Sequence, residues 1–141
     1  MLVIGIKSNC LKNNWGFGGG VMYNKRKIGG TNEQRAKEYL ESIGYQIIEC
    51  NYFTRVGEID IVAKEDNYLV FVEVKSRSNL GKGYPEEAVQ IRKMKSMIKT
   101  ANYYLLRHGL SFDTPCRFDV VSILEDNITV YKDAFQLDDA F

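Results

Sequence analysis

Proline and cysteine are scarce in this chain of 141 residues, which has two prolines and three cysteines. Cys10, Cys50 and Cys116 are too far apart for a zinc motif or a disulfide framework, so we expect reduced thiols and a cytoplasmic protein. No apolar run approaches the ~20 residues that cross a bilayer. The opening MLVIGIK also lacks the basic start and long apolar stretch of a signal peptide. We therefore expect no membrane partner.

Net charge is nearly absent as well, because 19 basic residues balance 18 acidic ones to give +1. The distribution is nevertheless uneven: residues 1–112 have an excess of basic groups, and residues 113–141 have an excess of acidic ones. A chain polarised in this way can form a local cationic surface in spite of its neutral total. The 45% hydrophobic and 26% charged content is that of a globular domain, and the length fits one domain.

The first 21 residues differ from the rest of the chain. They contain several glycines, no acidic residue and no sustained hydrophobic periodicity, whereas the sequence after Met22 is regularly patterned. We predict a poorly ordered N-terminal extension over residues 1–21 and a single domain over 22–141. Alternatively, Leu2–Ile6 adds a short edge strand to that domain.

Hydrophobic spacing predicts an α/β protein with the order α-β-β-β-α-β. Apolar residues recur every three or four positions in two segments, which predicts helices, and alternate in others, which predicts strands. A mixed sheet flanked by helices is the architecture that this order favours. The expected helices span 31–43 and 85–107, and the expected strands span 45–53, 57–63, 68–75 and 117–124, with 128–131 as a further partner.

Acidic and basic residues concentrate in two of these strands. In the segment VFVEVK, alternation places Phe71, Glu73 and Lys75 on one face and three valines on the other. In GEIDIV, alternation places Glu58 and Asp60 on one face, opposite Ile59 and Ile61. We expect these two strands to pair as a hairpin, which would bring their acidic side chains together in one patch.

Crowded carboxylates repel one another, and a divalent cation such as Mg²⁺ (or Mn²⁺) relieves that repulsion. A nearby lysine can then orient or deprotonate a water molecule, or stabilise charge on a phosphate. The alternative is an ordinary Glu–Lys pair on a solvated sheet face. Asp119 alternates with apolar neighbours and either faces the same patch or pairs structurally with Arg117 or Lys132.

Several motifs taken together resemble a known family. Glu33, G57-E-I-D60, F71-V-E-V-K75, a long helix and R117-F-D-V-V121 are similar to the bacterial YraN family, in the PD-(D/E)XK nuclease superfamily. The resemblance implies a restriction-endonuclease-like αβββαβ core. It also implies that Asp60, Glu73 and Lys75 form a metal-dependent signature, with Glu33 as a helix acid directed at the metal. From residue type alone, Glu33 could equally favour its helix N-terminus through the dipole.

A second functional signal is a basic face on the long helix. Arg92, Lys95 and Lys99 share one side of it, and between Ala88 and Phe112 there are five basic residues and no acidic one. Together with Arg77, just past the signature strand, they suit a nucleic-acid backbone. The alternative is a solvated helix face and a solvated loop charge.

Two functions follow from these residues. The first is a Mg²⁺-dependent endonuclease that acts on DNA, including branched or otherwise structured DNA, as its similarity to Holliday-junction resolvases implies. In it Glu33, Asp60, Glu73 and Lys75 are catalytic, and the three acids bind the metal. Resolvases act as dimers, so the resemblance also implies a homodimer. The second function is a non-catalytic nucleic-acid-binding protein that retains a nuclease fold.

Overall fold

The computed structural model describes residues 25–77 and 91–136, apart from the side chains of residues 25–31 and 77. The predicted extension over residues 1–21, the domain start at Met22 and the helix start at Pro85 lie outside the described residues. The described elements are α1 (Lys25–Ser42), β1 (Gln46–Thr54), β2 (Gly57–Glu65), β3 (Tyr68–Arg77), α2 (Ile91–Arg107), β4 (Cys116–Leu124) and β5 (Asn127–Phe135).

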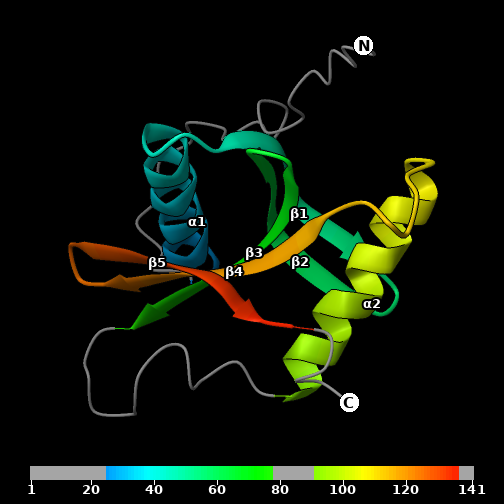
Figure 1. The fold of residues 1–141 in the computed structure, drawn as a ribbon. Helices are drawn as coiled ribbons and strands as arrows, with labels where there is room; N and C mark the ends of the chain where they lie inside the picture. Colours follow the sequence, from blue (N-terminus) through cyan, green and yellow to red (C-terminus); the bar gives the residue numbers. More distant parts are fainter. Residues whose placement is uncertain (1–24, 78–90, 137–141) are drawn as a thin grey trace, which may run out of the picture.

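Five strands form one mixed sheet in the order β1-β2-β3-β4-β5 (Figure 1). All neighbours are antiparallel except β3 and β4, which run parallel. Parallel neighbours require a crossover connection, and α2 lies within it. The predicted αβββαβ core with a mixed sheet flanked by helices is confirmed. The partner strand expected over 128–131 is also present, as the edge strand β5.

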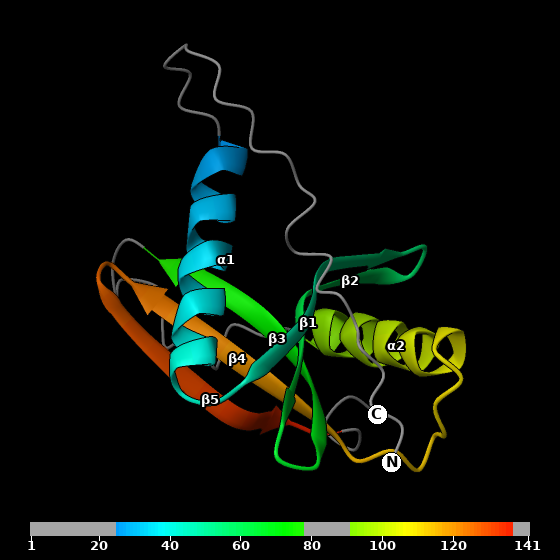
Figure 2. The same ribbon diagram turned by 90° about the horizontal axis from the view of Figure 1, so that it is seen from above.

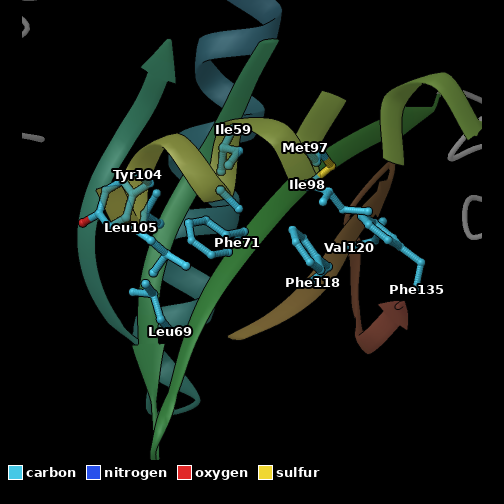
Figure 3. Close-up of a cluster of buried hydrophobic side chains, with 12 residues drawn as sticks. Ile59, Leu69, Phe71, Met97, Ile98, Tyr104, Leu105, Phe118, Val120 and Phe135 are labelled. Atoms are coloured by element: carbon cyan, nitrogen blue, oxygen red, sulfur yellow. The ribbon is translucent and has the colours of Figure 1, made fainter. Parts of the chain in front are cut away.

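Two hydrophobic clusters hold the helices on opposite faces of the sheet (Figure 1). On one face, Ala36 and Leu40 of α1 pack against Val70 and Val72. On the other, α2 packs against strand residues that include Phe71 (Figure 3). The predicted alternation along β3 is therefore confirmed, because its valines face α1 and Phe71 faces α2.

The buried stripe of α2 differs from the one that apolar spacing predicts, which runs through Ile91, Met94, Ile98, Ala101 and Leu105. Ile91, which was expected to be buried, is 60% exposed, whereas Met97 and Tyr104 are buried. The helix reaches the sheet only about one turn after Ile91, and from there the stripe drifts to include Met97 and Tyr104 beside the expected Ile98.

Strand β2 changes its environment halfway along. Ile59 packs into the α2 cluster and Ile61 into the α1 cluster, so the prediction that they share a face is wrong. The backbone of β2 pairs with β3 only from Ile61 onward. On the β1 side, Asn51 adopts a positive φ of 53° next to this point. The free part of the β1–β2 hairpin thereby turns away from β3 and toward α2 (Figure 2).

Two findings bear on the expectations about cellular location. Cys116 is a free cysteine, but Cys50 is disulfide-bonded, so the expectation of reduced thiols is wrong for Cys50. Since disulfides persist mainly in oxidising compartments, cysteine usage no longer supports a cytoplasmic location. Within the described ranges, neither helix combines the length and apolar character needed to cross a membrane.

Candidate metal and nucleic-acid site

Asp60 stands where the backbone pairing between β2 and β3 ends. Ile61 and Val72 are the last partners of that ladder. One step further, Oδ2 of Asp60 accepts a hydrogen bond from the backbone N–H of Val74, at 2.7 Å. The aspartate side chain thus replaces the missing strand and is held beside the central part of β3.

Glu73 is the acid at the centre of the site, and its side chain is only 4% exposed. Its Oε1 lies 2.8 Å from Nζ of Lys75, two residues along the same face of β3. Its Oε2 lies 2.9 Å from Nζ of Lys93, which comes from α2. The structure therefore brings Glu73 and Lys75 together, as the alternation in β3 predicted.

Burial and crowding change the acidity of Asp60. Loss of water contact, and then the nearby charge of Glu73, raise the pKa of Asp60 from 3.8 to about 7, although the N–H of Val74 and the charge of Lys93 oppose this. A carboxyl group with so high a pKa resists carrying its negative charge beside another carboxylate. Such perturbed groups cluster at functional sites.

Glu33 reaches the same region from α1. Burial raises the pKa of Glu33, whereas a hydrogen bond with Asn51 lowers it. The charges of Glu58 and Glu73 raise it further. The structure thus places the helix acid within electrostatic reach of Glu73. Glu58 is half exposed and lies 3.9 Å from Nζ of Lys93.

Lys93 is the residue of this site that was not predicted. Burial disfavours the charged form of Lys93 and lowers its pKa. The close contact and charge of Glu73, together with the charges of Asp60 and Glu58, outweigh burial and raise the pKa of Lys93 above its ordinary value. A signal for it exists in the sequence, because Lys93 stands four residues before Met97 and eight before Ala101, in line with the buried stripe. A charged residue at such a position requires a buried partner of opposite charge.

The carboxylates fit a divalent cation in chemistry but do not form a ready-made cage. Among the described residues, no three histidine, cysteine, aspartate or glutamate side chains are grouped as a complete metal cluster. Glu73 Oε2 is buried and, despite the proximity of Lys93, has no well-formed hydrogen bond from any described group. A buried carboxylate oxygen in this condition suits a hard cation, which binds oxygen ligands. Asp60, Glu73 and Glu33 as metal ligands remain a prediction.

The residues predicted to bind nucleic acid lie on α2 and at the end of β3. Arg92 and Lys99 are exposed on α2 and Lys95 is half-buried there. Arg77 is the last residue of β3. The helix face has the basic character that was predicted, and its binding role remains a prediction.

Asp119 belongs to a separate network on the sheet. Both of its oxygens accept hydrogen bonds from Arg117 at 2.8 Å, and its Oδ2 also accepts one from the hydroxyl of Tyr45 at 2.7 Å. Arg117 in turn lies 2.7 Å from Glu65. Of the two alternatives for Asp119, the structural pairing with Arg117 is confirmed.

Comparison with known proteins supports one family. The profile described as "Uncharacterised protein family UPF0102" matches residues 32–123. A UPF0102 protein of Lachnoclostridium phytofermentans is 54% identical over 112 residues, which cover 79% of this chain and 95% of that protein. One of Clostridioides difficile is 47% identical over 116 residues, covering 81% of this chain and 100% of that protein. The chain therefore belongs to the UPF0102 family, which is the YraN family that its motifs resemble.

Proposed function

We propose that this protein is a Mg²⁺- or Mn²⁺-dependent endonuclease of the PD-(D/E)XK type that cleaves DNA. The observation that carries the proposal is the convergence of Asp60, Glu73 and Lys75 from two adjacent strands, at the point where β2 and β3 separate. A merely solvated Glu–Lys pair does not account for a glutamate that is buried and approached by two lysines.

Each residue has a chemical role in this proposal. Asp60 and Glu73, assisted by Glu33, would hold the cation, which when bound supplies charge stabilisation at a phosphate oxygen. Lys75 is on the exposed side of Glu73 and is 32% exposed, so it can reach a water molecule or a phosphate. We assign Lys75 to orienting the attacking water, to whose oxygen its ammonium group donates a hydrogen bond.

The substrate is assigned from the surface beside the site. Arg77 ends the strand that holds Glu73 and Lys75, and the basic face of Arg92, Lys95 and Lys99 lies on the helix that contributes Lys93. Cations beside a carboxylate centre attract a phosphate backbone without reading its sequence. We propose DNA as the substrate, including branched or otherwise structured DNA, cleaved by a homodimer.

A second candidate, a non-catalytic nucleic-acid-binding protein, is favoured by one observation. Lys75 and Lys93 already balance the charge of Glu73 from two sides. A site neutralised by lysines can persist as a structural core without any cation. The two candidates differ in whether the carboxylates are needed for chemistry or only for stability.

One experiment separates the two candidates. Single-stranded, duplex, flap and four-way-junction DNA are incubated with the protein in Mg²⁺, Mn²⁺ or EDTA, beside the Asp60→Asn variant. The nuclease predicts cleavage with metal only, and its loss in the variant. DNA binding without cleavage under all conditions would leave the binding protein as the function. RNA versions of the same substrates test the choice of DNA.

A further inference from the structure

Lys93 connects the helix to acids from both strands of the site. Its Nζ lies 2.9 Å from Glu73 Oε2 on β3 and 3.9 Å from Glu58 Oε1 on β2. The side chain is 24% exposed, so it is partly shielded by these acids and partly open to solvent. One flexible cation therefore spans the place where the two strands part.

The two carboxylate oxygens of Glu73 contact different lysines. Oε1 faces Lys75, which extends from the same strand two residues away. Oε2 faces Lys93, which is attached to a different element and lacks hydrogen-bond geometry there. Both lysines have long, flexible side chains, but Lys75 starts from the same strand as Glu73 whereas Lys93 starts from α2.

The negative charge at Glu73 Oε2 could be balanced by a divalent cation in place of Lys93. Asp60, Glu58 and Glu33 all lie within electrostatic reach of either Lys93 or Glu73. Without metal, the ammonium group of Lys93 balances part of the negative charge of these acids. A cation bound by the same carboxylates would repel Lys93, because two positive charges that approach one oxygen repel each other strongly in a partly buried site.

We propose that Lys93 and the divalent cation are alternative occupants at Glu73 Oε2, so that Lys93 keeps the acids assembled until the cation displaces it. This inference rests on the proposed metal-dependent function and deepens it. The displaced ammonium group stays attached to the helix that carries Arg92 and Lys99, so it is added to the cationic face when the metal is in place. Lys93 is thus a positioning residue that couples metal binding to phosphate binding.

The first test measures metal affinity by titration calorimetry with Mn²⁺ in the absence of DNA. Lys93→Met keeps the apolar stem of the side chain and removes the competing charge. We expect it to bind Mn²⁺ at least about fivefold more tightly than the wild type, as expected for coupled binding. Lys99→Met is the matched control, since it removes the same charge from the same helix at an exposed position, and we expect no change in its Mn²⁺ affinity.

The second test uses the wild-type protein and does not depend on how the variant folds. Lysine acylation by a small amine-reactive reagent is followed by mass spectrometry with and without Mn²⁺. We expect the acylation rate of Lys93 to rise several-fold when Mn²⁺ is added, because its amine leaves Glu73. The rate at the exposed Lys64 should stay the same. An unchanged rate at Lys93, in protein that binds Mn²⁺, would overturn the inference.

The outcomes distinguish this inference from the proposed function. If the wild type binds Mn²⁺ and Asp60→Asn does not, while Lys93→Met has equal or weaker affinity, the metal site stands and the role of Lys93 is refuted. If only Lys93→Met binds Mn²⁺, the competition is confirmed in its strongest form. If neither protein binds Mn²⁺, both the metal site and the inference fail.

Discussion

Gly57 and Ser96 approach each other so closely that no side chain fits at position 57. A Cβ atom built on Gly57 would lie 1.9 Å from Oγ of Ser96 and 3.0 Å from Oγ1 of Thr100. The hydroxyl of Ser96 donates a hydrogen bond to the carbonyl oxygen of Val56, at 2.8 Å. The turn of the β1–β2 hairpin thus docks directly on α2, three residues beyond Lys93.

The first prediction follows from this close approach. Gly57→Ala should push α2 away from the hairpin, because the added methyl group overlaps the Ser96 side chain. We expect the free energy of unfolding to fall by about 1–3 kcal/mol, the usual cost of overpacking. Urea denaturation followed by circular dichroism measures it.

A second substitution identifies the cause of that decrease. Ser96→Ala removes the nearest atom of the overlap, so Gly57→Ala combined with Ser96→Ala should recover part of the stability that Gly57→Ala alone removes. If the double variant is as unstable as the sum of the two single variants, the packing of Gly57 on Ser96 does not determine the effect.

The second prediction concerns the charge of Asp60. Because the pKa of Asp60 is raised to about 7, the folded protein keeps this proton at pH values where the unfolded chain has released it. Ionised Asp60 therefore costs stability, and this cost is fully present above pH 7. In EDTA at pH 8, Asp60→Asn should raise the melting temperature by a few degrees, while its oxygen still accepts the Val74 N–H. The increase should be smaller at pH 5 and vanish only near pH 4, because the cost builds up between the ordinary pKa of 3.8 and the folded pKa of about 7.

The control for this prediction is Asp113→Asn, which removes a charge from an exposed position outside the site. Its melting temperature should match that of the wild type at both pH values. An increase for Asp60→Asn that is equal at pH 5 and pH 8 would show that packing, rather than relief of a buried charge, is responsible.

The fold was predictable because each element carries its own local signal. The period of α1 and the alternation of β3 depend on residues that are adjacent in the sequence. Both are confirmed, although α1 begins at Lys25, before its predicted start at residue 31. The same alternation predicted the shared face of Phe71, Glu73 and Lys75. Local patterns of this kind are reliable as long as the element stays regular.

The parts that were missed depend on packing between distant segments. The bend beside Asn51 places Ile59 and Ile61 on different faces, and strict alternation cannot represent a strand that leaves its partner. Lys93 lies one residue away from Arg92, and its alignment with the buried Met97 sets it apart from the basic face. Only the packing of α2 on the sheet shows that its partner is Glu73. Helix-face patterns alone do not tell which charged residue meets an acid on another element.

The third prediction concerns the ion pairs of Glu65, which lie away from the candidate site. A hydrogen bond from Lys132 lowers the pKa of Glu65, and Arg117 adds to the effect against the opposing influence of burial. A lowered folded pKa means that this stabilisation is present above the ordinary pKa of 4.5 and is lost as pH falls through the folded pKa. Glu65→Gln should be less stable than the wild type by about 1 kcal/mol at pH 7.

Urea denaturation between pH 7 and pH 3 measures this difference in the free energy of unfolding. The difference should shrink below pH 4.5, because the wild type then loses the same charge. Glu41→Gln, at an exposed position of α1, is the control and should show no such pH-dependent difference. A difference for Glu65→Gln that is as large at pH 3 as at pH 7 would refute an ionic origin.

The last prediction tests the basic face of α2. Arg92→Glu combined with Lys99→Glu reverses two exposed charges and leaves the half-buried Lys95 in place. If the face binds phosphates, DNA affinity should fall for every sequence alike, since phosphate binding carries no sequence information. The slope of log K against log salt concentration should become shallower by up to about 1.8, or about 0.9 for each phosphate that the variant no longer neutralises.

Fluorescence anisotropy in EDTA measures this binding at several salt concentrations without cleavage. The matched control is Lys37→Glu combined with Lys64→Glu, which changes the net charge equally on α1 and β2. Long-range attraction depends on net charge and would weaken equally in both variants, whereas direct phosphate binding weakens only in the α2 variant. Because the Debye length is about 10 Å at 0.1 M salt, the two variants should differ most at and above that concentration. Equal affinity and equal salt slopes for both would mean that this helix face is merely solvated.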